Sequence, residues 1–272
     1  MARRSLKLLL AAVALAALGG GAWWWYESQK PCCAAPEPAA FPAPEPDRPK
    51  LGLMTSLPLY WPAGADMAAI TSGEAGVPWQ RRLLEVGHEL VPLDTLSPIP
   101  GLSPDDPETD PLAGLERLAV IQPRGLAPAD NVALDAWVRG GGHLLLVLDP
   151  LLTGEYPFAL GDPRRPVDTA LMPPVVARWG LGVTFDEMQP ATRQLRLRSR
   201  EITVSQAGQI DRNQDRAAAD SSCEIGAEKI VAQCRVGDGT VTLVADAAVF
   251  EQRELAGANG ESIQALMDYA FD

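Results

Sequence analysis

The segment Ala129–Pro150 constrains the fold of this chain more than any other part of the sequence. It combines a helical pattern, three glycines at 140–142 and an apolar run that ends at Asp149-Pro150. The apolar residues that recur at helical spacing, and so form one face, are Val132, Ala133, Ala136 and Trp137. Leu144–Leu148 is apolar without alternation, which is typical of a strand covered by helices on both faces. This order predicts an α/β domain with a mainly parallel sheet and flanking helices.

Four segments in the first half of the chain have the composition of strands. They are Lys50–Thr55, Glu89–Leu93, Leu118–Gln122 and Leu144–Leu148. Pro78-Trp79 opens a predicted helix that ends near Val86. The stretch Ser97–Pro111 is rich in proline and aspartate and is expected to be a surface loop. Strands that alternate with helices predict right-handed crossovers and therefore a parallel sheet.

The C-terminal half alternates more between polar and apolar residues. Leu195–Ile210 and Cys223–Val236 are expected to be antiparallel additions. Asp238-Gly239 favours a hairpin turn, because these residues supply the positive φ angles that such turns need. The other predicted elements are a helix at Val167–Trp179 that is interrupted at Pro173-Pro174, a buried strand at Thr240–Ala245 and a closing helix at Glu261–Phe271.

The first 49 residues predict a membrane segment and a linker. Leu8–Tyr26 carries no charge and is close in length to the roughly 20 apolar residues that span a bilayer. Arg3, Arg4 and Lys7 precede it, which predicts a cytoplasmic N-terminus. We therefore expect a basic cytoplasmic tip at 1–7, a transmembrane signal anchor at 8–26, a Pro/Ala/Glu-rich linker at 27–49 and a periplasmic α/β domain at 50–272.

These expectations place the chain in the inner membrane as a single-pass protein. Trp23–Tyr26 would form an aromatic belt at the outer interface. The alternative is a cleavable signal peptide, because Gly20 and Ala22 are small residues at positions suited to cleavage. The mature chain would then be released into the periplasm after cleavage near Ala22.

The net charge limits the kinds of partner. The chain has 23 basic and 35 acidic side chains, a formal net charge of −12. Proteins that bind nucleic acid or anionic membrane surfaces present Lys and Arg to the phosphates. The charge therefore argues against a nucleic-acid partner.

The cysteines leave two alternatives open. Cys223 and Cys234 flank Gly226–Lys229, and a hairpin centred there would place them opposite each other. They would form either a cross-strand disulfide or two free thiols in a half-buried sheet. Cys32 and Cys33 are adjacent in the linker and are expected to pair between chains rather than with each other.

Polar residues stand at the ends of three predicted strands. Asp149 and Asp246 each follow a buried strand, and Thr55 and Ser56 end the first one. Ligands of open α/β sheets bind outside the carboxyl ends of the strands, so these four residues are candidates for one ligand-binding site. The alternative is that each aspartate caps the turn or helix that follows it.

The sequence shows no familiar catalytic or metal-binding motif. His88 and His143 are the only histidines, and they form no metal-ligand pair. The chain has neither a Gly-x-Ser-x-Gly elbow nor a Gly-x-x-x-x-Gly-Lys loop. The acidic residues at 105–110 lack the glycine and the terminal glutamate of an EF-hand, which favours a solvated loop over a calcium site. We therefore predict no catalytic residues, no metal and no cofactor.

Several short motifs occur in an order shared with a known family. Leu57-Pro58 follows the first strand, and Pro78-Trp79 starts a helix. The later motifs are Pro123, Asp135, Arg139-Gly140-Gly141 and Asp149-Pro150. In this order they resemble the soluble domain of GldG-like proteins, auxiliary subunits of an uncharacterised ABC transport system first associated with gliding motility. The resemblance covers Leu51–Pro150 well and Val167–Asp272 loosely.

The resemblance implies a fold related to flavodoxin-like and class I glutamine-amidotransferase domains. In the amidotransferases a nucleophilic cysteine follows a central strand at a tight turn. The equivalent turn here is Gln122–Gly125, which has no thiol. This departure favours a binding or assembly role over amide hydrolysis.

Two functional hypotheses follow. The first is a non-enzymatic, membrane-anchored periplasmic auxiliary subunit of an ABC-type transport or envelope complex. It would act by docking to a permease, an ATPase or other envelope components. The second is a periplasmic ligand-binding or vestigial hydrolase domain that uses the carboxyl edge of the parallel sheet.

Overall fold

The computed structural model describes residues 44–103 and 105–272. The predicted cytoplasmic tip, the transmembrane anchor, the cleavage position near Ala22 and the linker up to residue 43 lie outside the described residues. Cys32 and Cys33 lie outside them as well. No helix within the described ranges combines the length and the apolar character that a bilayer crossing requires.

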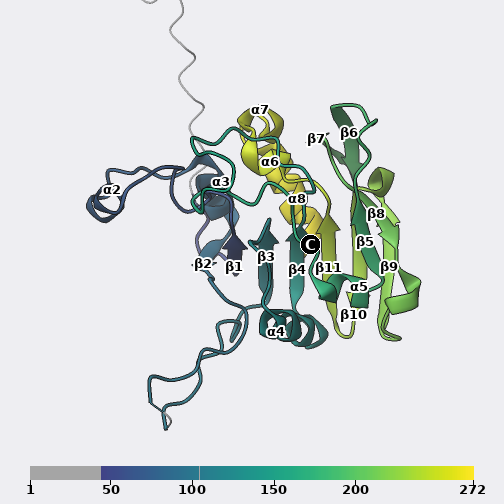
Figure 1. Ribbon diagram of the computed structural model, residues 1–272, viewed down its shortest axis with the longest axis horizontal. Coiled ribbons are helices and arrows are strands. Elements are labelled where there is room, and N and C mark those ends of the chain that lie inside the picture. Colours follow the sequence, from purple (N-terminus) through teal and green to yellow (C-terminus); the bar gives the residue numbers. More distant parts are fainter. Residues whose placement is uncertain (1–43, 104) are drawn as a thin grey trace, which may run out of the picture. The chain divides into compact units, whose positions relative to one another are not determined.

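A seven-stranded sheet is the central element of the described chain (Figure 1). Its strands are β1 (Lys50–Thr55), β2 (Glu89–Pro92), β3 (Arg117–Ile121), β4 (His143–Val147), β9 (Ser221–Gly226), β10 (Val231–Val236) and β11 (Gly239–Val244). Their order across the sheet is β2-β1-β3-β4-β11-β10-β9. β1, β2, β3, β4 and β11 pair in parallel, whereas β10 and β9 continue the sheet in antiparallel. The predicted mainly parallel sheet with antiparallel additions is confirmed.

Helices cover both faces of the sheet, and each face has its own hydrophobic core. One core includes residues of α3 (Trp79–Gly87), α6 (Ala248–Glu251), α7 (Arg253–Ala256) and α8 (Glu261–Phe271); the other includes α4 (Pro128–Arg139) and α5 (Pro174–Arg178). Successive side chains of β4 alternate between them, because strand side chains point to opposite faces in turn. Leu145 and Val147 belong to the first core, and Leu144 and Leu146 to the second. Burial on both faces explains the unbroken apolar run of β4.

Two small sheets and several short turns complete the fold. β5 (Leu181–Thr184) pairs with β8 (Gln209–Arg212), and β6 (Thr192–Leu197) pairs with β7 (Arg200–Ser205), both in antiparallel. The antiparallel pairing predicted within Leu195–Ile210 is therefore confirmed, but these strands form separate two-stranded sheets. The remaining elements are α2 (Met67–Ser72) and the short 3-10 turns Gln214–Arg216 and Ala227–Lys229.

The helix predicted at Val167–Trp179 is wrong over most of its length. Only Pro174–Arg178 is helical. Pro173 precedes it in an extended conformation, with φ −64° and ψ 135°, because a residue before a proline disfavours the helical region. Ala170 instead donates a main-chain hydrogen bond to the Asp149 carbonyl oxygen at 2.9 Å. The segment before α5 therefore runs beside the end of β4.

The predicted hairpin joins β10 to β11, but its turn residues are Gly237 and Asp238 rather than Asp238 and Gly239, because Val236 pairs with Gly239. The positive φ, 57°, is at Gly237. The turn packs against the end of α4, where Asp238 N–H donates to the Arg139 carbonyl oxygen at 3.2 Å. A Cβ atom at Gly239 would overlap the carbonyl oxygen of Val138. Glycine at this position therefore allows the strand to pass directly over the helix end.

Candidate functional site

The carboxyl ends of β1 and β3 are the place where an open α/β sheet of this order would hold a ligand, because the strand order reverses there. Ser56 follows β1, and its hydroxyl donates to the Gln122 carbonyl oxygen at 2.6 Å. The same hydroxyl accepts a hydrogen bond from Val167 N–H at 3.2 Å. The Thr55 hydroxyl accepts from Leu57 N–H at 3.0 Å, within its own loop. Both predicted site residues thus bond to neighbouring main chain.

Gln122 connects the ends of β3 and β4. Its side chain is fully buried, and its φ of 45° places the backbone in the left-handed region. The amide nitrogen donates to the carbonyl oxygens of Asp149 at 3.0 Å and Val167 at 2.9 Å. The amide oxygen accepts from Asp149 N–H at 2.8 Å. Sequence reasoning gave this side chain no role, although a polar residue between a buried strand and Pro123 is a usable signal.

Asp149 follows β4 and is fully buried. One carboxylate oxygen accepts from Leu151 N–H at 2.8 Å, as expected of a residue that caps the next turn. The other oxygen accepts from Ala247 N–H at 2.9 Å, beyond the end of the neighbouring strand β11. Asp149 therefore caps its own turn and also ties β4 to β11.

Asp246 follows β11 and has an exposed fraction of 1%. Its carboxylate accepts from Ala248 N–H at 3.0 Å, at the start of α6. The second oxygen accepts from Ser205 N–H at 2.9 Å, at the end of β7. Asp246 thus caps the turn that leads into α6, as the alternative to a ligand site predicted. It also joins β11 to the small sheet β6-β7.

These bonds form a polar seam along the carboxyl edge of the sheet, made of Ser56, Gln122, Asp149 and Asp246. Gln122 joins Ser56 to Asp149, and Asp149 accepts from Ala247 N–H, next to Asp246 in the chain. Three of the four predicted residues thus lie along this edge, and Thr55 stays outside the seam. The walls of the cavities beside α4 and above β9, β10 and β11 contain no residue of the seam. The seam therefore presents its polar groups to the protein rather than to an open site.

Glu251, at the end of α6, adds a third acidic side chain near the seam. Its carboxylate accepts from Thr153 N–H and Gly154 N–H, both at 3.1 Å, and from the hydroxyl of Tyr156. These bonds hold the loop that follows β4. Within the described ranges, no group of three or more His, Cys, Asp or Glu side chains has the arrangement of a metal site.

Burial raises the pKa of all three acidic groups. The pKa of Asp149 lies well above its usual value because of burial first and the negative charge of Asp246 second. Burial also raises the pKa of Asp246 to about 7 and raises that of Glu251. Raised pKa values are frequent at catalytic sites, but structural networks produce them too. Here the carboxylate oxygens already accept main-chain hydrogen bonds, so the three groups form a structural network.

We expect Asp246 to make the domain about 2 kcal/mol more stable near pH 5.5 than near pH 8. Its pKa rises from 3.8 to about 7 on folding, so the folded state binds more protons between these values. The stability from this group is fully present below pH 3.8 and is lost as the pH rises through about 7. Urea denaturation followed by circular dichroism across this range measures the slope.

Two variants separate this effect from others. Asp246→Asn should make the slope less steep, with part of it remaining because the pKa values of Asp149 and Glu251 are raised as well. Asp162→Asn, at an exposed ion pair with Arg164, should leave the slope unchanged in this range. Burial lowers the pKa of His88, which acts in the opposite direction. Because His88 is present in every protein compared, the difference in slope reports Asp246 together with its effect on the pKa of Asp149. Identical slopes for Asp246→Asn and the natural chain would contradict the prediction.

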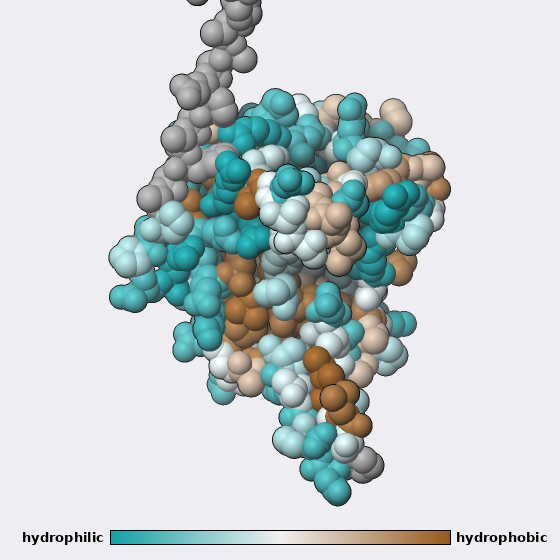
Figure 2. All heavy atoms as spheres, turned by 90° about the vertical axis from the view of Figure 1, so that its left-hand side faces the viewer, coloured by the Kyte–Doolittle hydropathy of each residue, from teal (hydrophilic) through white to brown (hydrophobic). Residues whose placement is uncertain are grey.

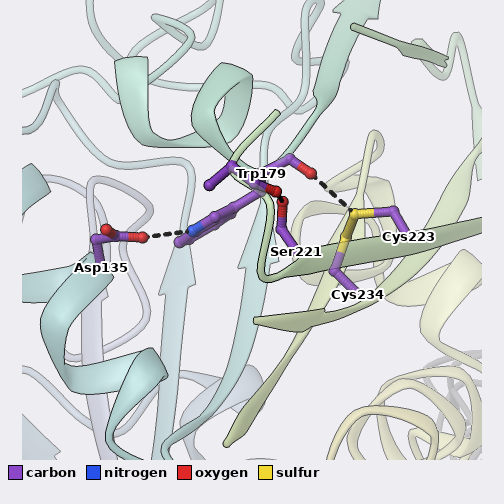
Figure 3. The surroundings of a disulfide bond; sticks show 6 residues. Asp135, Trp179, Ser221, Cys223 and Cys234 are labelled. Atoms are coloured by element: carbon purple, nitrogen blue, oxygen red, sulfur yellow. Dashed lines mark hydrogen bonds between the residues drawn. A yellow bond between two sulfur atoms is a disulfide. The ribbon is translucent and has the colours of Figure 1, made fainter. Parts of the chain in front are cut away.

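Cys223 and Cys234 form a disulfide between β9 and β10, where they are directly opposite partners (Figure 3). Of the two alternatives, a cross-strand disulfide and two free thiols, the structure contains the disulfide. Cys223 Sγ lies 3.2 Å from the carbonyl oxygen of Trp179, whose indole N–H donates to Asp135 on α4 at 2.8 Å. The disulfide therefore packs beside a buried tryptophan that links the antiparallel strands to α4.

The apolar face predicted on α4 from Val132, Ala133, Ala136 and Trp137 is not the face that enters the core, because none of these four residues is buried. Leu134 and Val138 enter the core, whereas Val132 is 71% exposed. A cavity of about 690 Å³ lies on one side of this face, and a second of about 430 Å³ lies between α4 and α5. Val132 and Ala136 line both cavities. This outer face is an apolar surface that the sequence analysis did not assign to a site.

No model of a known protein family matches the chain, and no curated protein matches it either. Among solved structures, the exo-β-1,4-mannosidase Op5Man5 from Opitutaceae bacterium strain TAV5 is similar at 15% identity and a TM-score of 0.46, over 82% of this chain and 36% of that one. The β-galactosidase from Rahnella sp. R3 is similar at 10% identity and a TM-score of 0.41, over 82% and 32%. A putative ThuA-like protein from Bacteroides uniformis is similar at 13% identity and a TM-score of 0.41, over 85% and 94%. This chain spans about a third of the two glycosidases, and likeness at this level carries no inference about activity.

Proposed function

We propose that this chain is a non-enzymatic auxiliary subunit, anchored in the inner membrane, whose periplasmic domain docks on an ABC-type transport or envelope complex. The observation that carries the proposal is the polar seam. Gln122, Asp149 and Asp246 are buried and Ser56 is half-buried, and all four are bonded to the protein, at the edge where α/β proteins otherwise hold ligands. Among the described residues, this edge presents no free nucleophile or acid–base pair, which favours action through the surface.

A flavodoxin-like fold related to the glutamine amidotransferases is part of the proposal. The parallel strands run in the order β2-β1-β3-β4-β11, which has the 2-1-3-4-5 pattern of flavodoxin-like sheets. The turn after β3 carries Gln122 in the left-handed region, at the place where the amidotransferases carry a cysteine. An amide is not a nucleophile, so this turn supports the GldG-like resemblance without supporting amide hydrolysis.

The proposed anchor rests on the basic and uncharged segments at 1–26 and on the proline-rich linker. The last residues of that linker lie against α3 in the structure. Glu45 N–H donates to the Val86 carbonyl oxygen at 3.0 Å, and the guanidinium of Arg48 donates to the carbonyl oxygens of Glu85 and His88. The tether would therefore leave the domain beside the carboxyl end of α3.

Affinity purification of the tagged full-length chain from solubilised membranes tests the proposal. We expect a permease and an ATPase to be recovered with it, because a docking subunit remains bound through its domain. Mass spectrometry identifies the recovered proteins and the N-terminus of the chain itself. A tagged chain of residues 1–49 alone is the matched control, because it retains the predicted anchor without the domain.

Two results would overturn the proposal. The first is recovery of the chain alone from the soluble fraction, shortened near Ala22, which would favour the cleaved periplasmic alternative. The second is recovery of the same proteins by residues 1–49, which would show that the domain contributes nothing to docking.

A further inference from the structure

The outer face of α4 has the shape of a helix-binding surface. Its exposed or half-buried positions are Ala129, Val132, Ala133 and Ala136, which are spaced three or four residues apart. Side chains at this spacing form one row along a helix, and small side chains let a second helix approach closely. We call this row, together with the 690 Å³ cavity beside it, the α4 groove.

A projecting loop forms the other wall of the α4 groove. We call it the acidic loop (residues 97–103 and 105–111), and Ser97, Pro98 and Asp110 from it line the cavity. Figure 2 shows it at the bottom of the molecule, with hydrophobic atoms on its surface. Leu102 is fully exposed there, and Ile99 is 46% exposed. Exposed leucine and isoleucine on a projecting loop are available to contact a bound partner.

Both ends of the acidic loop are fastened to α4. At its start, one carboxylate oxygen of Asp130 accepts from the Thr95 hydroxyl at 2.7 Å, from Leu96 N–H at 2.9 Å and from Ser97 N–H at 3.0 Å. Beyond its other end, the Trp137 indole N–H donates to the Leu115 carbonyl oxygen at 3.1 Å. Within the loop, main-chain bonds join Ile99 and Thr109. The groove is therefore formed before any partner binds.

The unbalanced charge beside the groove is negative. The acidic loop carries Asp105, Asp106, Glu108 and Asp110 and no basic residue. Within the described residues, none of the four takes part in an ion pair. On the other side of α4, Arg139 and Arg178 both pair with Asp135, and Arg139 also pairs with Asp220. The arginines are thus neutralised, and the acidic loop is not.

We propose that the α4 groove and the acidic loop bind a basic amphipathic helix of a partner protein, an inference that rests on the proposed docking function. The apolar side of that helix would cover Val132 and fill the cavity, as in other helix-in-groove complexes. Its Lys and Arg side chains would face the acidic loop and fix its orientation. A second copy of this chain fits poorly, because its net charge of −12 would set like charges against the loop.

Site-specific photo-crosslinking in the native membrane tests the proposed site. A photoreactive phenylalanine analogue replaces Val132 in the full-length chain, and the same analogue at Met188, which is 90% exposed between β5 and β6, is the matched control. We expect cross-links from position 132 to map to one basic amphipathic helix, with a yield several-fold above that from position 188. Cross-links to a second copy, to residues 1–43 of this chain or to a segment without basic residues overturn the proposal, as do equal yields.

A charge-neutralising variant tests the role of the acidic loop. Asp105→Asn/Asp106→Asn/Glu108→Gln should lower the cross-link yield from position 132 several-fold, and added salt should lower it in the natural chain. Glu74→Gln/Glu89→Gln/Glu254→Gln removes the same charge from exposed positions elsewhere and should leave the yield unchanged. Equal losses in both variants would contradict a specific role for the loop.

The two proposals fail in different ways. When the tagged natural chain recovers membrane partners but position 132 gives no specific cross-link, the α4 groove is the wrong site and docking stands. When the natural chain recovers no partner at all, the docking function itself is wrong.

Discussion

Replacing Asp149 with alanine should lower the free energy of unfolding by about 2–5 kcal/mol, because two main-chain N–H groups, one buried and one partly buried, lose their acceptor. These are the main-chain groups of Leu151 and Ala247, at the ends of β4 and β11. Removing one of two neighbouring negative charges offsets part of this loss, since the charge of Asp246 raises the pKa of Asp149. Urea denaturation of the purified domain, followed by circular dichroism, measures the change.

Thr55→Ala is the matched control for Asp149→Ala. It removes a hydroxyl that accepts one hydrogen bond, from Leu57 N–H in an adjacent loop, and should cost only about 1 kcal/mol. The same experiment separates the structural role of Asp149 from ligand binding. If Asp149→Ala retained the stability of the natural domain but lost a thermal shift caused by a polar ligand, the ligand-binding alternative would replace the proposed function.

Removing the Cys223–Cys234 disulfide should lower the free energy of unfolding by about 3 kcal/mol. The bond joins residues 11 positions apart, and a cross-link over such a loop restricts the unfolded chain. The variant Cys223→Ala/Cys234→Ala removes the bond without leaving a new buried hydroxyl at Cys234, which is only 3% exposed. Denaturation of the oxidised natural chain and of the variant provides the comparison.

Cys32→Ala/Cys33→Ala is the control for this measurement, because it removes two cysteines of the linker and should leave the unfolding free energy of the domain unchanged. Treating the natural chain with a reducing agent should produce the same loss as the double alanine variant. A variant as stable as the oxidised natural chain would show that the pairing of β9 with β10 does not need the bond.

The central sheet could be predicted because burial on both faces leaves a strong pattern. The apolar run of β4 has no alternation, since Leu144 and Leu145 enter different cores. The helix predicted at Val167–Trp179 carried an interruption at Pro173-Pro174, and only the part after Pro173 is helical. The part before the prolines failed because it is held beside the end of β4, where Ala170 N–H donates to the Asp149 carbonyl oxygen. Local chemistry, rather than periodicity, decides where that segment becomes helical.

The candidate sites could not be predicted from the sequence for a different reason. The spacing of apolar residues predicts that α4 has an apolar face, but it does not predict which face meets the sheet. Leu134 and Val138 pack inward, and Val132 is left on the outside. Likewise, the roles of Gln122 and Asp130 depend on partners far away in the sequence, such as Val167 and Leu96. Only the fold brings these partners together.

The position of β1 has a mechanical consequence for a domain held by its amino-terminal end. β1 lies between β2 and β3, and its residues pair with both neighbours. Tension applied ahead of Lys50, along the strand, would load both ladders in shear, so that their hydrogen bonds share the force. An edge strand such as β2 would pass the same load through a single ladder. A tether attached to β1 therefore pulls on an interior strand, next to the edge strand β2, where two ladders rather than one resist being peeled apart.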